Sequence, residues 1–372
     1  MARFTIATAT AALMGSTMIA QIAYADISRT DQSMRILFEE VGPTGNYAEL
    51  SYGRVQPEAS TNSTPGVGNP LGDYTLPGFG YLYQLDDTWS FAVTYDTPFG
   101  GNTAYPTASA FFGGFADVDT DSLTVMARYR IDERISIHAG VRAMQAEGTI
   151  FTNVGGGAPN FHRLSGDSDT GIGYVIGAAY EIPDIALRVA LTYNSPVEVT
   201  FDATEIPAPA PLGPGGATTQ TTFDLEFPES VNLEFQSGIA QDTLVFGSIR
   251  HAFWDGFTLA TPGAGQYLQY TSDTTTYTLG VGRRFNENWS GSVSYTHRTD
   301  GTVPSDTPLS PTTGLDALTV ALRYEQETFT ISGGITYGIP GDQNINNALV
   351  PGGVNFDDNE VLAVGLRVGF RF

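Results

Sequence analysis

The sequence predicts an all-β fold, a 14-stranded antiparallel transmembrane β-barrel with a short N-terminal hatch segment. Three observations predict this fold class. Apolar and polar side chains alternate with a period of two along most of the chain, short and long connections follow one another in turn, and the last strand ends on Phe372. The 43 glycines argue against a helical bundle, because each one weakens a helix.

Composition excludes several function classes. The chain of 372 residues has a formal net charge of −23, and its 17 basic residues are all arginines. A chain this acidic is a poor nucleic-acid binder, because contacts to phosphates require clustered cations. The absence of cysteine excludes disulfides, thiolate metal sites and cysteine nucleophiles.

The N-terminus has the features of a signal peptide. A positive start at Arg3 precedes the apolar stretch Phe4–Ile22 and the cleavage pattern Ala23-Tyr24-Ala25. We therefore expect an exported chain that begins at Asp26, and no later run of 18 apolar residues predicts a transmembrane helix. The predicted division of the chain is a signal peptide at 1–25, a hatch or plug segment at 26–45 and the barrel at 46–372.

The alternation is clearest in Leu123–Ile131, where the odd positions are apolar and most even positions are polar. A strand of this kind has two unlike faces. It fits either a soluble antiparallel sandwich or a membrane barrel with lipid outside and a polar lumen. The same pattern recurs at 135–142, 185–192, 318–325 and 329–336.

Connection lengths favour the barrel. Six short turns and seven long loops make thirteen connections and therefore 14 strands. Outer-membrane barrels have short turns at one end, long loops at the other and an even strand number, whereas sandwiches do not need this asymmetry. The short turns lie near residues 86, 132, 183, 241, 286 and 326, and the long loops near 57–72, 99–117, 153–167, 204–221, 257–270, 300–313 and 339–355.

The arginines give a second test of the barrel. An arginine on the lipid face at mid-membrane costs about 2–4 kcal/mol, so arginines within strands should lie on the polar face. Arg283 has the opposite parity but lies beside a turn, and the alternation around Arg250 is too mixed to assign a face. Eight arginines have the expected parity: Arg128, Arg130, Arg142, Arg188, Arg298, Arg323, Arg367 and Arg371.

The last strand gives a third test. From Leu362 to Phe372 apolar residues occupy every second position. Such a strand can close a barrel against its first strand and leave no open edge. The terminal Phe372 also resembles the signal that the barrel assembly machinery reads in outer-membrane barrels.

Six segments together carry a resemblance to a known family: Gly45–Gly53, Asp73–Pro77, Thr94–Gly100, Glu181–Pro196, Pro228–Gly238 and Tyr277–Ser290. They resemble the FadL/TodX family of outer-membrane transporters for long-chain fatty acids and hydrocarbons. This resemblance implies a barrel plugged by an N-terminal hatch, capture of a hydrophobic substrate by outer loops, and release through a gap beside the third strand. The chain departs from the family in its shorter hatch segment, which lacks the usual Asn-Pro-Ala stretch.

Three groups of residues are candidate sites. Pro98, Gly100 and Gly101 could mark the lateral opening, or could simply end the third strand. Arg142 and Arg188 could bind a carboxylate, or could brace the lumen through Glu49, Asp96, Glu234 and Glu325. Apolar loop residues could form a hydrophobic entrance, or could pack the loops together as a lid: Phe111, Phe112, Phe115, Phe161, Leu164, Tyr267 and Leu268.

The sequence thus predicts a monomeric channel in the outer membrane of a Gram-negative bacterium. We expect passive uptake of hydrophobic compounds, long-chain fatty acids first, with lipid and lipopolysaccharide as neighbours. A general diffusion porin and a non-transporting structural or adhesive barrel are the alternatives. The four histidines show no metal spacing and no catalytic set is recognisable, so no enzyme activity, metal or cofactor is predicted.

Overall fold

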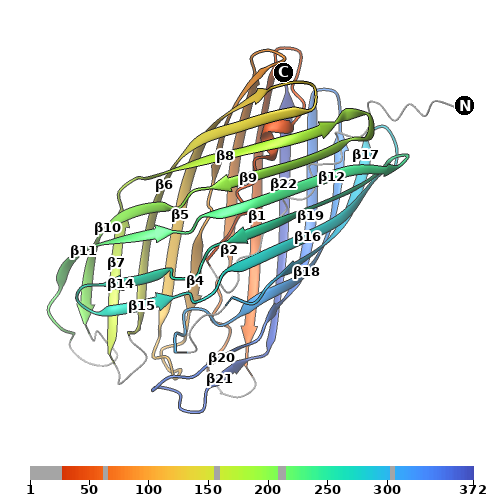
Figure 1. Ribbon diagram of the computed structural model, residues 1–372. Coiled ribbons are helices and arrows are strands. Elements are labelled where there is room, and N and C mark those ends of the chain that lie inside the picture. Colours follow the sequence, from red (N-terminus) through yellow and green to blue (C-terminus); the bar gives the residue numbers. More distant parts are fainter. Residues whose placement is uncertain (1–26, 62–65, 155–159, 208–214, 302–305) are drawn as a thin grey trace, which may run out of the picture.

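The computed structural model describes residues 27–61, 66–154, 160–207, 215–301 and 306–372, and these form a closed antiparallel β-barrel (Figure 1). Eighteen strands belong to the barrel sheet, and four of the crossings are each divided into two strands, so the wall has 14 crossings. The predicted fold class is confirmed, and the sandwich alternative is wrong. The predicted signal peptide lies outside the described residues.

The barrel strands in chain order are β1 (Asn46–Ser60), β2 (Tyr74–Gln84), β3 (Trp89–Asp96), β4 (Gly100–Ala104), β5 (Phe115–Arg130), β6 (Ile135–Asn153), β7 (Phe161–Ser168), β8 (Gly171–Ile182), β9 (Leu187–Asn194), β10 (Val197–Pro207), β11 (Thr219–Phe227), β12 (Ser230–Ala240), β13 (Thr243–Ala252), β16 (Thr274–Arg284), β17 (Trp289–Arg298), β18 (Thr313–Glu325), β19 (Phe329–Gly341) and β22 (Asp358–Arg371). Two separate hairpins, β14 (Thr258–Thr261) with β15 (Gly265–Gln269) and β20 (Gln343–Ile345) with β21 (Val354–Phe356), lie at the long-loop end, opposite the C-terminus in Figure 1. The short 3-10 helices are η2 (Arg35–Phe38) and η3 (Pro183–Ile185).

The barrel closes where the last strand meets the first. β22 pairs with β1 over fourteen register positions, from Tyr47↔Arg371 to Ser60↔Asp358. Phe372 continues the contact, because its N–H donates to the carbonyl of Asn46 at 3.1 Å. No barrel edge is left open at this seam, as the pattern of the last strand predicted.

The predicted loops were partly wrong. β4 lies within the expected loop 99–117, and β7 begins within the expected loop 153–167 and ends one residue beyond it. Both belong to an extension of the wall at the long-loop end, where strands continue past the apolar belt. The outward positions of this extension are more polar than those of a membrane strand, which explains why the sequence pattern predicts loops there.

The two faces of the wall follow the predicted parity. Leu123, Val125 and Ile176 are among the exposed apolar side chains of the outer belt. Arg283 is exposed beside its turn and Arg250 faces the lumen. Of the eight arginines predicted to face inward, Arg130 is half-buried near a turn and the others are buried: Arg128, Arg142, Arg188, Arg298, Arg323, Arg367 and Arg371.

Each of the four divided crossings changes its inward face at the division. In β9 the even positions are buried, whereas in β10, after Ser195-Pro196, the odd positions are buried. A slip of one residue exchanges the two faces of a strand. At the long-loop end the inward side is therefore apolar and the outward side polar, the reverse of the membrane belt. The other divisions lie at 97–99, 169–170 and 228–229.

Among the described residues, no helix is long and apolar enough to cross a membrane.

Candidate functional site

An apolar cavity of about 80 Å³ lies inside the barrel at the long-loop end. Inward side chains of β4–β7, β10 and β11 form its wall, and the β14–β15 hairpin covers it. The described lining residues include no Asp, Glu, Arg or His. Large apolar side chains dominate the lining: Ile150, Leu164, Phe201, Phe223, Leu225, Phe227, Phe257, Leu259 and Leu268.

The division of the third crossing contributes to the same core. Phe99, which lies between β3 and β4, is buried and stacks on Phe227 with ring centroids 4.9 Å apart. Trp254 meets Phe99 edge-on at 5.7 Å. Offset and edge-to-face pairs of this kind stabilise aromatic clusters. The interruption therefore turns an aromatic ring into the barrel beside the apolar cavity.

The described N-terminal segment, residues 27–45, lies in the lumen between the apolar cavity and the short-turn end. Ser28 forms an antiparallel bridge with Phe99, and η2 buries Ile36 and Leu37. The ring of Phe38 lies between two guanidinium groups, those of Arg128 and Arg188, each 4.3 Å from its centroid. Cation–π contacts of this length are attractive, most of all away from water.

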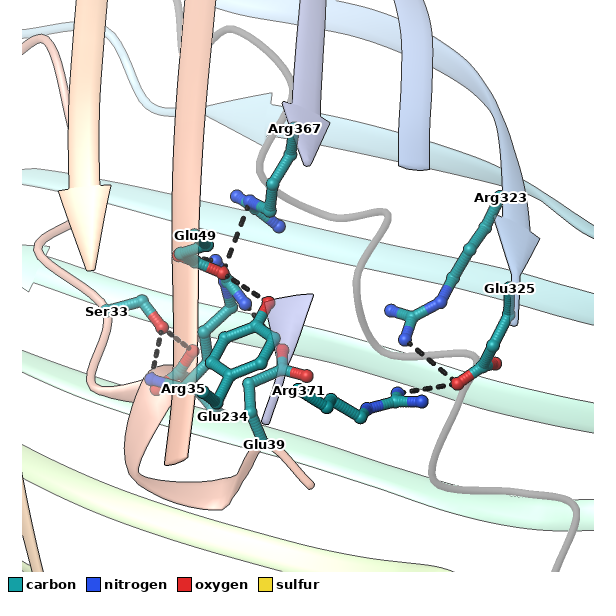
Figure 2. A network of polar contacts seen from close by, with 10 residues as sticks. Ser33, Arg35, Glu39, Glu49, Glu234, Arg323, Glu325, Arg367 and Arg371 are labelled. Atoms are coloured by element: carbon teal, nitrogen blue, oxygen red, sulfur yellow. Dashed lines mark hydrogen bonds and ion pairs between the residues drawn. The ribbon is translucent and has the colours of Figure 1, made fainter. Parts of the chain in front are cut away.

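Ion pairs fasten this segment to the wall (Figure 2). Arg35 of η2 binds Glu39 at 2.6 Å and also binds Glu49 of β1. Glu49 in turn lies 3.8 Å from Arg367 of β22 and accepts a hydrogen bond from Tyr47 at 2.8 Å. Buried charges persist only when they are paired. Two further contacts in the same view are Ser33 with Glu234 and Arg371 with Glu325.

The strand pairing of the wall is interrupted beside the third crossing. β2 pairs with β3 from Gln84↔Ser90 to Phe79↔Tyr95, and contact resumes only at the bridge Leu71↔Thr103. Between these points Tyr74–Gly78 pair with β1 but have no described strand partner on the other side. We name this unpaired part of the wall, between residues 74–78 and 97–101, the wall window.

Arg29 of the N-terminal segment crosses the wall window. Its guanidinium lies 4.7 Å from the ring centroid of Tyr74 and forms an ion pair with Asp119 on the outer face of β5. The side chain passes over Gly100, where a Cβ atom would collide with the guanidinium. The Arg29 N–H also donates to the carbonyl of Pro98 at 2.7 Å. Glycine at position 100 thus makes room for the arginine.

A second cavity, of about 110 Å³, lies at the wall window, and we call it the window cavity. Its lining includes buried Arg142, residues 76–79 of β2, and residues of β1 and β22. Leu123 is the last apolar outward residue of β5 before Asp121 and Asp119, so the window lies at the edge of the apolar belt.

The two candidate carboxylate-binding arginines lie in different settings. Arg142 lines the window cavity and donates to three neutral acceptors, Thr124 at 3.1 Å, Gln32 at 2.9 Å and Asn194 at 3.2 Å. Arg188 stacks on Phe38 and lines neither cavity. Both arginines thus contact the N-terminal segment, but only Arg142 lines the window cavity.

The candidate entrance residues do not form a single patch. Tyr267 packs beside Leu268 in the core cluster around the apolar cavity. Phe112 packs edge-on against Phe161 on β7, which was expected in a loop. The others divide as follows: Leu164 and Leu268 line the apolar cavity, Phe111 belongs to a separate cluster with Tyr105 and Phe356, and Phe115 lies half-buried at the start of β5.

Sequence reasoning missed Arg29, Pro77 and the apolar cavity wall. Pro77 lies in the part of β2 that pairs with β1 but not with β3. Proline within a strand indicates an edge without a hydrogen-bonded neighbour. The segments Val197–Glu205 and Phe223–Phe227 alternate apolar residues with acids. Acids cannot face lipid, so this alternation could have placed the segments beyond the membrane with their apolar side inward.

A family model described as outer membrane protein transport protein (OMPP1/FadL/TodX) matches residues 10–349. The chain belongs to this family. It is 23% identical over 308 residues to a long-chain fatty acid transport protein of Salmonella typhi, covering 73% of this chain and 68% of the relative. A second relative with the same description, from Escherichia coli, is 23% identical over 315 residues with the same coverage.

Solved structures share the fold at low identity. A FadL homologue of Pseudomonas aeruginosa superposes with a TM-score of 0.74 at 14% identity, covering 98% of both chains. The toluene transporter TodX of Pseudomonas putida superposes with a TM-score of 0.67 at 15% identity, covering 96% of this chain and all of the other. This member of the FadL/TodX family is therefore a barrel in the outer membrane of a Gram-negative bacterium, and it transports hydrophobic compounds. The family consists of channels rather than enzymes. In such barrels the long loops are extracellular and the short turns periplasmic.

Proposed function

We propose that the protein takes up long-chain fatty acids passively, binding them in the apolar cavity and releasing them sideways through the wall window. A line of three cavities carries the proposal. A third cavity, of about 60 Å³, shares Ile27 and Tyr270 with the apolar cavity and Arg29 with the window cavity. The three cavities therefore adjoin one another from the extracellular end to the window.

The residues at the junctions belong to the N-terminal segment. Ile27 borders the two outer cavities, and its carbonyl accepts a hydrogen bond from Gly100 at 2.8 Å. Arg29 borders the window cavity. A shift of only these few residues would join the cavities into one path. Apolar substrates would then move by partition alone, since burial of apolar surface is favourable without an energy source.

Two features bear on the choice of substrate. The apolar cavity suits a hydrocarbon chain, with Leu164, Leu268 and the neighbouring Tyr267 as proposed contacts. Arg142 in the window cavity supports a fatty acid rather than a neutral hydrocarbon, because its hydrogen bonds go to neutral acceptors that a carboxylate could replace.

The closed wall bears on the oligomeric state and on the molecules that surround the barrel. The sheet is completed by β1 and β22 of the same chain, which supports a monomer surrounded by lipid and lipopolysaccharide. We further propose that the assembly machinery recognises β22 and Phe372, and that residues 1–25 are removed on export.

Uptake measured in cells tests the proposal. Deletion of the gene should slow uptake of radiolabelled palmitate at limiting concentration and leave uptake of a small sugar unchanged, with recovery on complementation. Unchanged palmitate uptake would argue for a structural or adhesive barrel. Reduced sugar uptake would argue for a general diffusion porin.

Substitution of Arg142 tests the substrate class. Arg142→Met should reduce palmitate uptake about tenfold or more, since a hydrogen bond to a charged group contributes about 1.5–3 kcal/mol. Uptake of hexadecane, which has no carboxylate, should not change. Arg323→Met is the matched control, because Arg323 is a buried lumen arginine that lines none of the three cavities. Equal effects of Arg142→Met on both substrates would exclude a carboxylate site there.

A further inference from the structure

We infer that the β14–β15 hairpin is a lid through which substrate reaches the apolar cavity, and that Glu205 is the latch that holds it closed. The inference rests on the transport function proposed above. It concerns the extracellular face of the apolar cavity, on the side away from the wall window.

The hairpin is separate from the barrel wall. β14 and β15 pair with each other in a sheet of their own. β11 pairs with β10 along one edge, and on its other edge it lies beside β14 without a described ladder. Phe257, Leu259 and Leu268 line the apolar cavity from the hairpin side. Displacing the hairpin would therefore open the cavity along the seam with β11 and break no described barrel pairing.

Glu205, near the end of β10, holds the hairpin in place. It is 2% exposed, and its carboxylate accepts hydrogen bonds from the hydroxyl of Thr261 at 2.7 Å and the hydroxyl of Tyr267 at 2.6 Å. Both donors belong to the hairpin segment. Gly263 also lies against this carboxylate, where a Cβ atom would collide with it.

The carboxylate of Glu205 depends on the hairpin for its close hydrogen bonds. The nearest basic group is His162 of β7, with Nδ1 at 3.8 Å from Glu205 Oε1. Burial lowers the pKa of His162, although the carboxylate opposes this shift, so the imidazole is neutral at neutral pH. The two hydroxyls therefore supply the close hydrogen bonds to the carboxylate. When the hairpin moves away water can replace them, which keeps the net strength of the latch modest and the lid reversible.

The base of the hairpin can act as a hinge. Trp254 is completely buried and packs against Tyr270 at 5.0 Å, which anchors both ends of the segment. Gly256 lies between the anchor and β14, has a φ of +90°, and has open space around the position of a Cβ atom. A glycine with positive φ and an open Cβ position allows backbone rotation there, which would release its N–H from the carbonyl of Tyr270 at 3.2 Å.

Thiol labelling tests the latch without any substrate. The chain has no cysteine, so Leu268→Cys introduces a single buried thiol on the cavity side of the lid. In that background, Thr261→Val together with Tyr267→Phe should increase the labelling rate about tenfold or more. Thr258→Val is the matched control, because the Thr258 hydroxyl donates to the carbonyl of Gly256 and does not contact Glu205. An unchanged rate in the double variant would overturn the latch. Glu205→Gln, which retains the side-chain shape, repeats the test if the double variant fails to fold.

Cross-linking tests the lid. In Glu205→Cys/Gly263→Cys, a short cleavable bifunctional thiol reagent should reduce uptake of a fluorescent fatty acid into proteoliposomes about tenfold, with recovery on reduction. Asp202→Cys/Thr222→Cys, which joins neighbouring positions of β10 and β11, should have no effect when cross-linked. Undiminished uptake through the locked hairpin would overturn the lid. Absence of uptake by the unmodified protein would instead overturn the proposed transport function, and the labelling experiment would still decide the latch.

Discussion

At the scale of single residues, Glu49 joins three parts of the molecule. Its carboxylate contacts Arg35 of the N-terminal segment, Tyr47 of its own strand and Arg367 of the closing strand (Figure 2). All of these side chains are buried. Removing one partner of a buried ion pair leaves an uncompensated charge, which costs more than the pair itself contributes.

Glu49→Ala should therefore loosen the N-terminal segment by about 3–5 kcal/mol. Hydrogen–deuterium exchange at the backbone of η2 should become at least a hundredfold faster, while exchange in the barrel strands stays slow. Glu58→Ala is the matched control, because Glu58 lies on the exposed face of the same strand. Equal protection of η2 in both variants would show that other contacts, such as those of Phe38, hold the segment.

At the scale of elements, three periplasmic hairpins use one turn design. An Asp or Asn side chain accepts hydrogen bonds from the N–H groups two and three residues later, at Asp86, Asp132 and Asn286. Such turns are local, because the side chain replaces a backbone acceptor. This locality explains why the short turns could be located from the sequence.

The Asp132 turn should weaken in acid. The N–H groups of Arg134 and then Ile135 lower the pKa of the Asp132 carboxyl below its usual value. A carboxyl with a lowered folded pKa stabilises the fold above its unfolded pKa of about 4 and loses this contribution as the pH falls through the folded value. Asp132→Asn keeps an acceptor that does not titrate. As the pH is lowered from 5 into strong acid, the urea unfolding midpoint of the native protein should therefore fall more than that of Asp132→Asn. A difference between the two midpoints that stays constant with pH would contradict this.

The divided crossings are the second feature of this scale. Three of the four divisions contain a proline, namely Pro98, Pro196 and Pro228. Proline has no N–H to donate to a neighbouring strand, so it interrupts the strand pairing. The one-residue shift at each division then exchanges the inward and outward faces of the strand. The divisions thereby convert a wall with a polar inside into one with an apolar inside.

Replacing 97–101 by strand-forming residues should close the wall window. A continuous third crossing could pair with Tyr74–Gly78 of β2, so palmitate uptake should fall while the barrel still folds, as judged by its heat-modifiable migration on gels. Pro196→Thr is the control at a division away from the window. Normal uptake in a folded 97–101 variant would exclude the window as the exit.

At the scale of the whole molecule, the described N-terminal segment lies inside the lumen, and we propose that it closes it. It occupies the space between the apolar cavity and the periplasmic end and contacts β1, β3, β5 and β12. A barrel of this strand number has an interior that must be filled or remain as a channel.

Deletion of residues 27–38 should convert the protein into an ion-conducting pore. In planar bilayers the full-length mature protein should show little conductance, whereas the shortened protein should conduct, because the lumen wall is polar and lined with arginines. Substantial conductance by the intact protein would support the porin alternative instead.

The sequence by itself determined the features that depend on neighbouring residues and on the two solvents of a barrel wall. Alternation such as that of Leu123–Ile131 follows from lipid on one side and a polar lumen on the other, and turns such as that at Asp132 are formed by adjacent residues. The tertiary structure decided where Arg29 and Glu205 act. Their partners, Asp119 and Tyr267, are distant in sequence and come close only when the wall closes, and the one-residue shifts at the divisions set which side chains meet inside.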